Sequence, residues 1–303
     1  MPTNNNSNFR WSSQSAFIVV SVGASLSLND FLSFPVMAGE NGGGAFLLMY
    51  AFFLLVLGLP LLMSEFMMGR MTRSNLVDAL DLLATENGAS IYWKVFGVLA
   101  IVAGFLILSS YSVVSGWSLA YFIKTGVGVY QGATLDGVKA LFNSFQSNSE
   151  AMMLWHTLFV VVIVTISAQN LRKGLQRIFV LLVPVMAVLL VIGLFYAFYS
   201  GGMTQSVEYI LYPDWSRVDA GMPLLALQRA FFTLALGLGI MVVFGAYLQE
   251  EVHIGYVSAQ IIVIDLLFSV ITGLAINALV FSTNVQPVFD DELAFRVLPV
   301  IFG

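Results

Sequence analysis

The chain has 303 residues, of which 59% are apolar and 10% are charged, and its mean hydropathy is +0.90. Soluble domains are about 45–50% apolar and roughly 25% charged, so this composition excludes an ordinary soluble domain and predicts a polytopic membrane protein. The lack of cysteine excludes a disulfide framework and thiolate metal sites. The formal charge of −5, with few basic residues, disfavours nucleic acid as a partner.

An enzymatic function is not expected. The sequence offers no set of nucleophile, histidine and acid, and the triglycine at 42–44 lacks the lysine and Ser/Thr of a P-loop. A cleavable signal peptide is not expected either, because the polar residues 1–10 run into an apolar stretch without a small-residue cleavage site. Insertion into the membrane is therefore expected through the spanning segments themselves.

Seven stretches approach the ~20 residues that a helix needs to cross the hydrocarbon core. In chain order they are residues 15–37, 46–68, 95–123, 152–167, 178–199, 223–248 and 256–281. We expect loops between them, including the connections 126–149 and 200–219, and a short amphipathic helix within residues 78–86. The predicted fold class is an all-α polytopic membrane protein.

Lysine and arginine positions favour a cytoplasmic N-terminus, because cytoplasmic loops carry the excess of these residues. With this orientation the cytoplasmic positions are Arg10, Arg70, Arg73, Lys94, Arg172, Lys173 and Arg177, and those outside are Lys124, Lys139, Arg217 and Arg296. Residues 1–14 are then expected in the cytoplasm. The connection 200–222 and the final residues 282–303 are expected as extracellular loops.

The first segment is interrupted near its middle. Polar residues at 25, 27, 29 and 30 separate the apolar run 17–22 from the one that resumes at Phe31, and Pro35 follows. Backbone groups freed from a helix at this depth cost several kcal/mol each unless they are buried in protein or line a watery cavity. We therefore interpret residues 25–33 as the wall of a small-molecule or ion pocket.

The sixth segment has a comparable interruption, with Gly237 and Gly239 in its middle. Glycine costs about 1 kcal/mol relative to alanine inside a helix. Close packing of small residues between helices would explain the two glycines on their own. Two interrupted segments five helices apart instead point to a transporter site between two inverted repeats.

The most specific motif is the run from Glu40 through Gly44, followed by Gly58-Leu59-Pro60 and by Glu65 with Arg70 five residues later. Further motifs are Trp11-Ser12-Ser13, Phe34-Pro35, Tyr50, Tyr111, Gly116-Trp117, Lys173-Gly174, Pro213-Asp214-Trp215 and Gln228 through Gly239. Together these residues resemble the neurotransmitter:sodium symporter family, which has the leucine-transporter type of fold.

The resemblance implies sodium-driven uptake of an amino acid or related small molecule by alternating access. It implies an inverted-repeat fold whose first and sixth helices are unwound at mid-membrane. Residues 15–199 would form the first repeat with five helices, and residues 223–281 would begin the second repeat. Because the family continues beyond a seventh helix, the chain is expected to be incomplete and to lack the eighth helix, which completes the second sodium site.

The same resemblance implies the site residues. Gly23 and Leu26 match the first-helix carbonyls of one sodium site, and Ser25, Asp30, Thr233 and Asp265 match the other sodium site. The substrate positions are Ser25, Ser27, Tyr111, Phe232, Ala235 and Leu238, with Tyr111 placed to donate its hydroxyl to a carboxylate. The positions at or beside the chloride site are Tyr50, Arg229, Thr233 and Ser269, although chloride is not assigned as a cofactor. Glu65 matches a buried acid that ties the second helix to the unwound amides of the sixth.

Several positions depart from the family. Asp30, Ser33 and Arg229 stand where asparagine, arginine and glutamine are usual, Asn29 and Ser27 replace two glycines, and Ser110 replaces a tyrosine. Each of Asp30, Arg229 and Asp265 places a charge in an apolar segment, which costs ~2.5–3.5 kcal/mol on insertion scales. We expect Arg229 to pair with Asp30, Asp265 or both, and the alternative is that it extends to the outer headgroups. This charge network, with Glu65, suggests that Arg229 partly replaces a bound ion or that one carboxylate takes up a proton.

Three functions remain open. The first is a sodium-coupled importer of a neutral amino acid in the plasma (inner) membrane. The second is a non-transporting protein of the same fold that binds or senses a ligand, which the altered charges would suit. The third is a channel-like or structural membrane protein. The sequence does not name one amino acid and predicts no oligomeric state.

Overall fold

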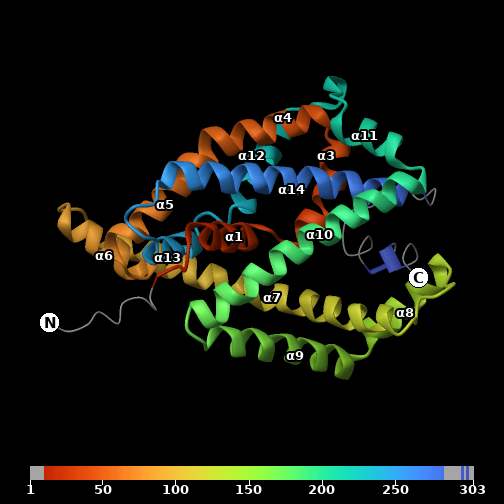
Figure 1. The fold of residues 1–303 in the computed structure, drawn as a ribbon, viewed down its shortest axis with the longest axis horizontal. Helices are drawn as coiled ribbons and strands as arrows, with labels where there is room; N and C mark the ends of the chain where they lie inside the picture. The colour runs from red at the N-terminus through yellow and green to blue at the C-terminus, as the bar shows by residue number, and fades with distance from the viewer. Residues whose placement is uncertain (1–9, 283–294, 297, 300–303) are drawn as a thin grey trace.

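The computed structural model describes residues 10–282, 295–296 and 298–299, and long helices dominate this part of the chain (Figure 1). Within the described residues five uninterrupted spans are long and apolar enough to cross a membrane: Gly44–Thr72, Ile91–Gly126, Ser149–Ser167, Arg172–Ser200 and Ile254–Ser282. The prediction of an all-helical protein with several membrane-length helices is therefore confirmed.

The other two predicted segments are split into shorter helices. The first consists of α1 (Gln14–Ser25), α2 (Leu28–Leu32) and α3 (Phe34–Glu40), and the sixth consists of α12 (Met222–Thr233) and α13 (Ile240–Ala246). Residues 25–33, which were predicted to form the wall of a pocket, include the helical turn of α2. Helix geometry is lost only at residues 26–27 and at Ser33.

The five uninterrupted spans include three irregular turns. In chain order their parts are α4 (Gly44–Phe53), a π-helical turn (Leu54–Gly58), α5 (Leu59–Thr72), a 3₁₀ turn (Ile91–Trp93), α7 (Lys94–Gly126), α9 (Ser149–Ser167), a π-helical turn (Arg172–Gln176), α10 (Arg177–Ser200) and α14 (Ile254–Ser282). The short amphipathic helix expected within residues 78–86 is present as α6 (Leu76–Glu86), which Asn75 caps by accepting from the Asp78 N–H.

Two connections that were expected to be loops contain helices. The prediction for residues 126–149 is wrong because α8 (Leu135–Ser147) lies there, and α11 (Met203–Leu211) similarly occupies part of residues 200–219. Thr134 caps α8 by accepting from the Gly137 N–H at 3.2 Å. Val138, Phe142 and Phe145 are buried along one face of this helix. A 3₁₀ turn (Trp215–Arg217) follows α11.

The interrupted helices lie in the interior of the molecule. α1 packs against α10, α13 and α14, and α12 packs against α4. Phe17 of α1 is fully buried and meets Phe66 of α5 edge to face, with ring centroids 4.9 Å apart. Apolar packing therefore holds the helices on either side of both gaps in the interior of the molecule.

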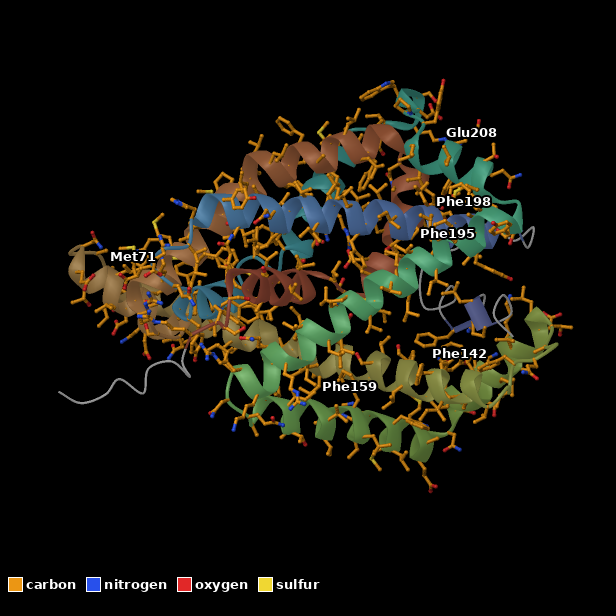
Figure 2. All side chains as sticks on the ribbon, viewed as in Figure 1. Met71, Phe142, Phe159, Phe195, Phe198 and Glu208 are labelled. Atoms are coloured by element: carbon orange, nitrogen blue, oxygen red, sulfur yellow. The ribbon has the colours of Figure 1, made fainter. Side chains whose placement is uncertain are left out.

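Apolar side chains also cover the outside of the molecule. On α10, Phe195 and Phe198 are 63% and 59% exposed (Figure 2). In the span Arg172–Ser200 none of the most apolar window is buried within the described structure. Such a surface is suited to lipid, because exposed apolar area on this scale is unusual for a soluble monomer.

Two of the sequence motifs meet in space. Gly44 donates its N–H to the Tyr212 carbonyl at 3.1 Å, and the Asp214 N–H donates to the Gly42 carbonyl at 3.1 Å. Gly43 has a φ of 54°, and a Cβ there would lie 2.6 Å from the Tyr209 carbonyl oxygen. Glycine is thus needed both for the turn and for the close backbone approach. The triglycine run therefore fixes the position of residues 212–214, which precede α12 in the chain.

Some expectations fall outside the described residues. Residues 1–9 of the expected cytoplasmic segment 1–14 are not described. Most of the expected extracellular loop 282–303 is also not described. These two expectations remain predictions.

Candidate substrate and ion site

The gap between α1 and α2 exposes backbone amides that side chains satisfy. Ser27 donates its N–H to Asp30 Oδ2 at 2.5 Å and its hydroxyl to the same oxygen at 3.0 Å. The Leu28 N–H donates to the hydroxyl oxygen of Tyr111, which comes from α7, at 2.6 Å. Because Tyr111 accepts here, its own hydroxyl hydrogen remains available to a ligand.

The gap between α12 and α13 spans residues 234–239. Gly237 and Gly239 have φ values of 79° and 75°, and Ala235 has a φ of 50°, which few non-glycine residues adopt. The Gly237 N–H donates to Glu65 Oε1 at 2.7 Å. Glu65 comes from α5 and is only 8% exposed. A carboxylate from α5 therefore accepts a hydrogen bond from the unwound backbone between α12 and α13.

Asp265 of α14 lies at the point where the two interrupted segments meet. Its side chain is fully buried and accepts from the Thr233 hydroxyl at 3.1 Å and from the Tyr50 hydroxyl at 3.2 Å. Ser25, the last residue of α1, also places its hydroxyl beside this carboxylate. The ends of α1 and α12 thus share one buried acid. We call Ser25, Tyr50, Thr233 and Asp265 the Asp265 cluster.

Asp30 and Arg229 form a buried ion pair between α2 and α12. An Arg229 η-nitrogen donates to Asp30 Oδ1, and the side chains are 7% and 0% exposed respectively. The guanidinium carbon also lies 5.3 Å from the centroid of the Phe34 ring, a cation–π distance. Of the two expected arrangements, Arg229 adopts pairing with Asp30 rather than extension to a membrane surface. The described residues show no direct ion pair between Arg229 and Asp265.

A cavity of about 300 Å³ opens next to this ion pair. It is lined by Ser33, Met37, Leu225, Gln228, Arg229 and Phe232. Phe232 is 60% exposed and forms part of its apolar wall. The cavity presents the Arg229 side chain to an incoming solute, with polar and apolar surface side by side.

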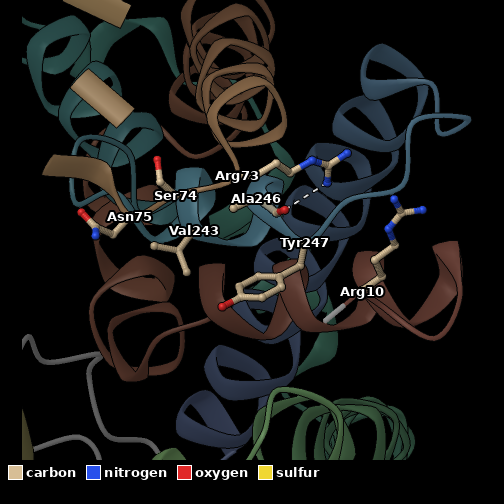
Figure 3. A pocket seen from close by; sticks show the side chains of 7 residues that line it. All are labelled: Arg10, Arg73, Ser74, Asn75, Val243, Ala246 and Tyr247. Carbon is tan, nitrogen blue, oxygen red and sulfur yellow. Dashed lines mark hydrogen bonds between the residues drawn. The ribbon is translucent and has the colours of Figure 1, made fainter. Parts of the chain in front are cut away.

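A larger cavity of about 590 Å³ lies away from both gaps, at the end of the molecule that carries Arg10 and Arg73 (Figure 3). Its lining residues are Arg10, Arg73, Ser74, Asn75, Val243, Ala246 and Tyr247. Burial, together with the positive charge of nearby Arg10, lowers the pKa of Arg73. We do not place the central chemistry here, because the unwound backbone and the buried carboxylates are elsewhere.

The structure separates one of the four residues predicted for a single sodium site from the other three. Ser25, Thr233 and Asp265 lie together, whereas Asp30 faces Arg229. Gly23 lies where α1 approaches α10, since a Cβ there would be 2.2 Å from the Phe179 ring. Leu26 ends α1 by donating its N–H to the Val22 carbonyl at 3.0 Å, so its own carbonyl lies in the gap.

The remaining predicted positions are distributed around these groups. Ser27 and Tyr111 line the first gap, and half-buried Ala235 and Leu238 lie in the second. Among the chloride positions, Tyr50 and Ser269 are fully buried, and the Tyr50 and Thr233 hydroxyls both donate to Asp265. Sequence reasoning missed Phe34 and Met37. The position of Phe34 four residues after Asp30 was the available signal, because one turn of helix places it on the same side.

In the part of the chain that the structure describes, five spanning helices and two interrupted ones that share buried polar groups define a polytopic membrane protein of the carrier type. The chain matches the sodium:neurotransmitter symporter family over residues 9–128 and 135–289. The chain therefore belongs to this family of transporters and is not an enzyme.

Individual proteins show the same relationship. An uncharacterised sodium-dependent transporter, YhdH of Bacillus subtilis (strain 168), is 33% identical over 293 residues, which cover 97% of this chain and 64% of YhdH. An uncharacterised sodium-dependent transporter of Haemophilus influenzae is 28% identical, over 100% of this chain and 68% of the relative. The crystal structure of MhsT in complex with L-phenylalanine matches with a TM-score of 0.85 and 34% identity, over 96% of this chain and 66% of MhsT. The chain thus spans about two thirds of these relatives, and 64% of YhdH.

Proposed function

We propose that the protein is a sodium-coupled carrier that imports a small neutral amino acid or related solute by alternating access. We place it in the plasma membrane with its N-terminus in the cytoplasm. The observation that carries the proposal is the Asp265 cluster, in which the last residues of α1 and α12 contact one buried carboxylate. Movement of either helix end therefore changes the surroundings of that acid.

The Asp265 cluster has the chemistry of a site for a hard monovalent cation. Its side chains offer a carboxylate and three hydroxyl oxygens, and alkali ions prefer oxygen ligands to nitrogen or sulfur. Backbone carbonyls released at the gaps supply further oxygen ligands in carriers with interrupted helices. Sodium is the cation that the family description supports.

The proposed substrate pocket lies between the two gaps. Ser27 and Tyr111 would bind polar groups of an amino acid, and Phe232, Ala235 and Leu238 would contact its side chain. The bovine relative B(0)AT2, 24% identical over 91% of this chain, is named a sodium-dependent neutral amino acid transporter. This name and the L-phenylalanine bound to MhsT support a neutral amino acid here.

We propose that chloride is not required. Tyr50, Thr233 and Ser269 surround Asp265, which already supplies a fixed negative charge at this position. A chloride ion added beside a buried carboxylate would be repelled. Replacing chloride with gluconate should leave substrate affinity unchanged.

The proposal is tested by ligand-dependent thermal stability of the complete natural protein in detergent. We expect neutral amino acids to raise the melting temperature in sodium chloride and to do so far less in choline chloride, because a ligand that binds only the folded state stabilises it. Acidic and basic amino acids serve as matched controls. Equal stabilisation in both salts would overturn sodium coupling.

A second candidate is a protein of the same fold that binds a ligand without transporting it. The ion pair between Asp30 and Arg229 favours it, because this contact joins the two interrupted segments and must adapt when they separate. Sodium-dependent binding without uptake into liposomes would support this alternative. Binding together with uptake would support the carrier.

A further inference from the structure

The buried charges near the two gaps do not balance. Asp30, Asp265 and Glu65 are buried acids, whereas Arg229 is the single buried basic side chain among the described residues. Glu65 is engaged with the Gly237 N–H. The local balance between the gaps therefore concerns two carboxylates and one guanidinium, which leaves one negative charge without a partner.

Asp30 already has protein partners on both oxygens. Oδ1 accepts from Arg229, and Oδ2 accepts from the N–H and the hydroxyl of Ser27. A sodium ion that bound Asp30 would have to displace the guanidinium and leave Arg229 buried without its counter-charge. Breaking a buried ion pair from one side is strongly unfavourable.

Asp265 is in the opposite situation. Its hydrogen-bond donors are hydroxyls, from Tyr50 and Thr233, which carry no charge. Within the described residues no lysine or arginine lies at ion-pair distance from it. Arg229 interacts electrostatically with Asp265 from beyond ion-pair distance, but it is in direct contact with Asp30. The two buried carboxylates together therefore still need one further cation or a proton to offset their charge.

We propose that Arg229 is a built-in cation that neutralises Asp30 and removes it from the sodium-binding site, so that sodium binds at Asp265 alone. This inference rests on the proposed function and specifies its ion site. Sodium would contact Asp265, Thr233 and Ser25 but not Asp30. The one uncompensated charge between the gaps then matches the charge of one sodium ion.

The proposal predicts how sodium affinity depends on charge. In Asp30→Asn the guanidinium loses its partner, remains near Asp265 and competes with sodium, so we expect affinity to fall at least tenfold. In the double variant Asp30→Asn/Arg229→Gln both charges are gone, and affinity should return to within about threefold of the unmodified protein. In Arg229→Gln the uncompensated acid should strengthen cation binding.

The experiment measures sodium-induced stabilisation of the complete natural protein against potassium at constant ionic strength, without amino acid. It needs no transport, and the melting temperature in potassium shows whether each variant folds. Arg217→Gln is the matched control, because Arg217 is 54% exposed and pairs with Asp214 outside the spans. Its sodium affinity should be unchanged.

The outcomes separate the two proposals. Loss of affinity in Asp30→Asn with recovery in the double variant supports the built-in cation. Loss in both, or loss in neither, overturns it while leaving a sodium-coupled carrier intact. No preference for sodium over potassium in the unmodified protein would overturn both proposals.

Discussion

The Glu65 carboxylate accepts the N–H of Gly237 at 2.7 Å, which links α5 to the unwound centre of the sixth segment. This contact supplies a hydrogen-bond acceptor that the backbone lacks, because the amides between α12 and α13 have lost their helical partners. A carboxylate is a strong acceptor for such an amide. The scaffold around the site is thus set by a residue that belongs to neither interrupted helix.

Glu65→Ala should destabilise the protein by ~1.5–3 kcal/mol, because the Gly237 N–H would lose its hydrogen bond to a charged acceptor. Glu65→Gln should cost about 1 kcal/mol or less, since the amide oxygen can still accept. Melting temperatures in detergent check both values. Equal stability of the two variants would show that the hydrogen bond does not hold the gap.

Gly69→Ala should destabilise the packing of α5 on α13. A Cβ at residue 69 would lie 1.8 Å from the Val242 carbonyl oxygen, so backbone must move. Overpacking of this kind costs about 1–3 kcal/mol or more. Gly193→Ala in α10 is the control, because nothing described lies within 4 Å of its added Cβ. A melting temperature that falls equally in both variants would contradict this explanation.

Trp11→Ala should open the end of the molecule that carries Arg10 and Arg73. Trp11 is 1% exposed and donates its indole N–H to the Phe244 carbonyl at 2.9 Å. Truncating a buried tryptophan to alanine lowers the free energy of unfolding by about 3–5 kcal/mol. These 303 residues contain no cysteine, so Val243→Cys in the 590 Å³ cavity reports access by thiol labelling. Labelling should accelerate in Trp11→Ala, and an unchanged rate would argue against this role.

Acid should weaken the contact between Asp214 and its neighbours. The hydroxyl and N–H of Ser216, with Arg217, hold the pKa of Asp214 below its ordinary value of 3.8. The ionised form therefore adds stability above pH 3.8, and this contribution disappears as pH falls through the lower folded-state pKa. Asp214→Asn and Ser216→Ala should both flatten the acid side of a melting-temperature profile. Profiles parallel to that of the unmodified protein would contradict this sign.

The long helices were predictable because each needs only an apolar run of sufficient length. The two gaps were also predictable, since polar residues at 25–30 and the glycines at 237 and 239 oppose a continuous helix. α8 and α11 were not predictable in this way, because both are much shorter than the apolar run that a spanning helix needs. For α8 the available pattern is short, namely a Thr134 cap followed by apolar residues at 138, 142 and 145.

The partner of Arg229 could not be fixed from the sequence. Asp30 and Asp265 both lay within reach, and the choice depends on how α2 and α12 are rotated toward one another, which local spacing does not determine. The second role of Asp30, accepting from Ser27 across the gap, was equally hidden. It depends on backbone that the sequence shows only to be non-helical.

Sodium coupling is tested most directly by the accumulation of labelled neutral amino acids in liposomes that contain the complete natural protein. We expect accumulation above the external concentration under an inward sodium gradient, and its loss in Asp265→Ala and Thr233→Ala. Equal accumulation when choline replaces sodium would contradict the central claim that sodium and substrate share the chamber between the two interrupted helices.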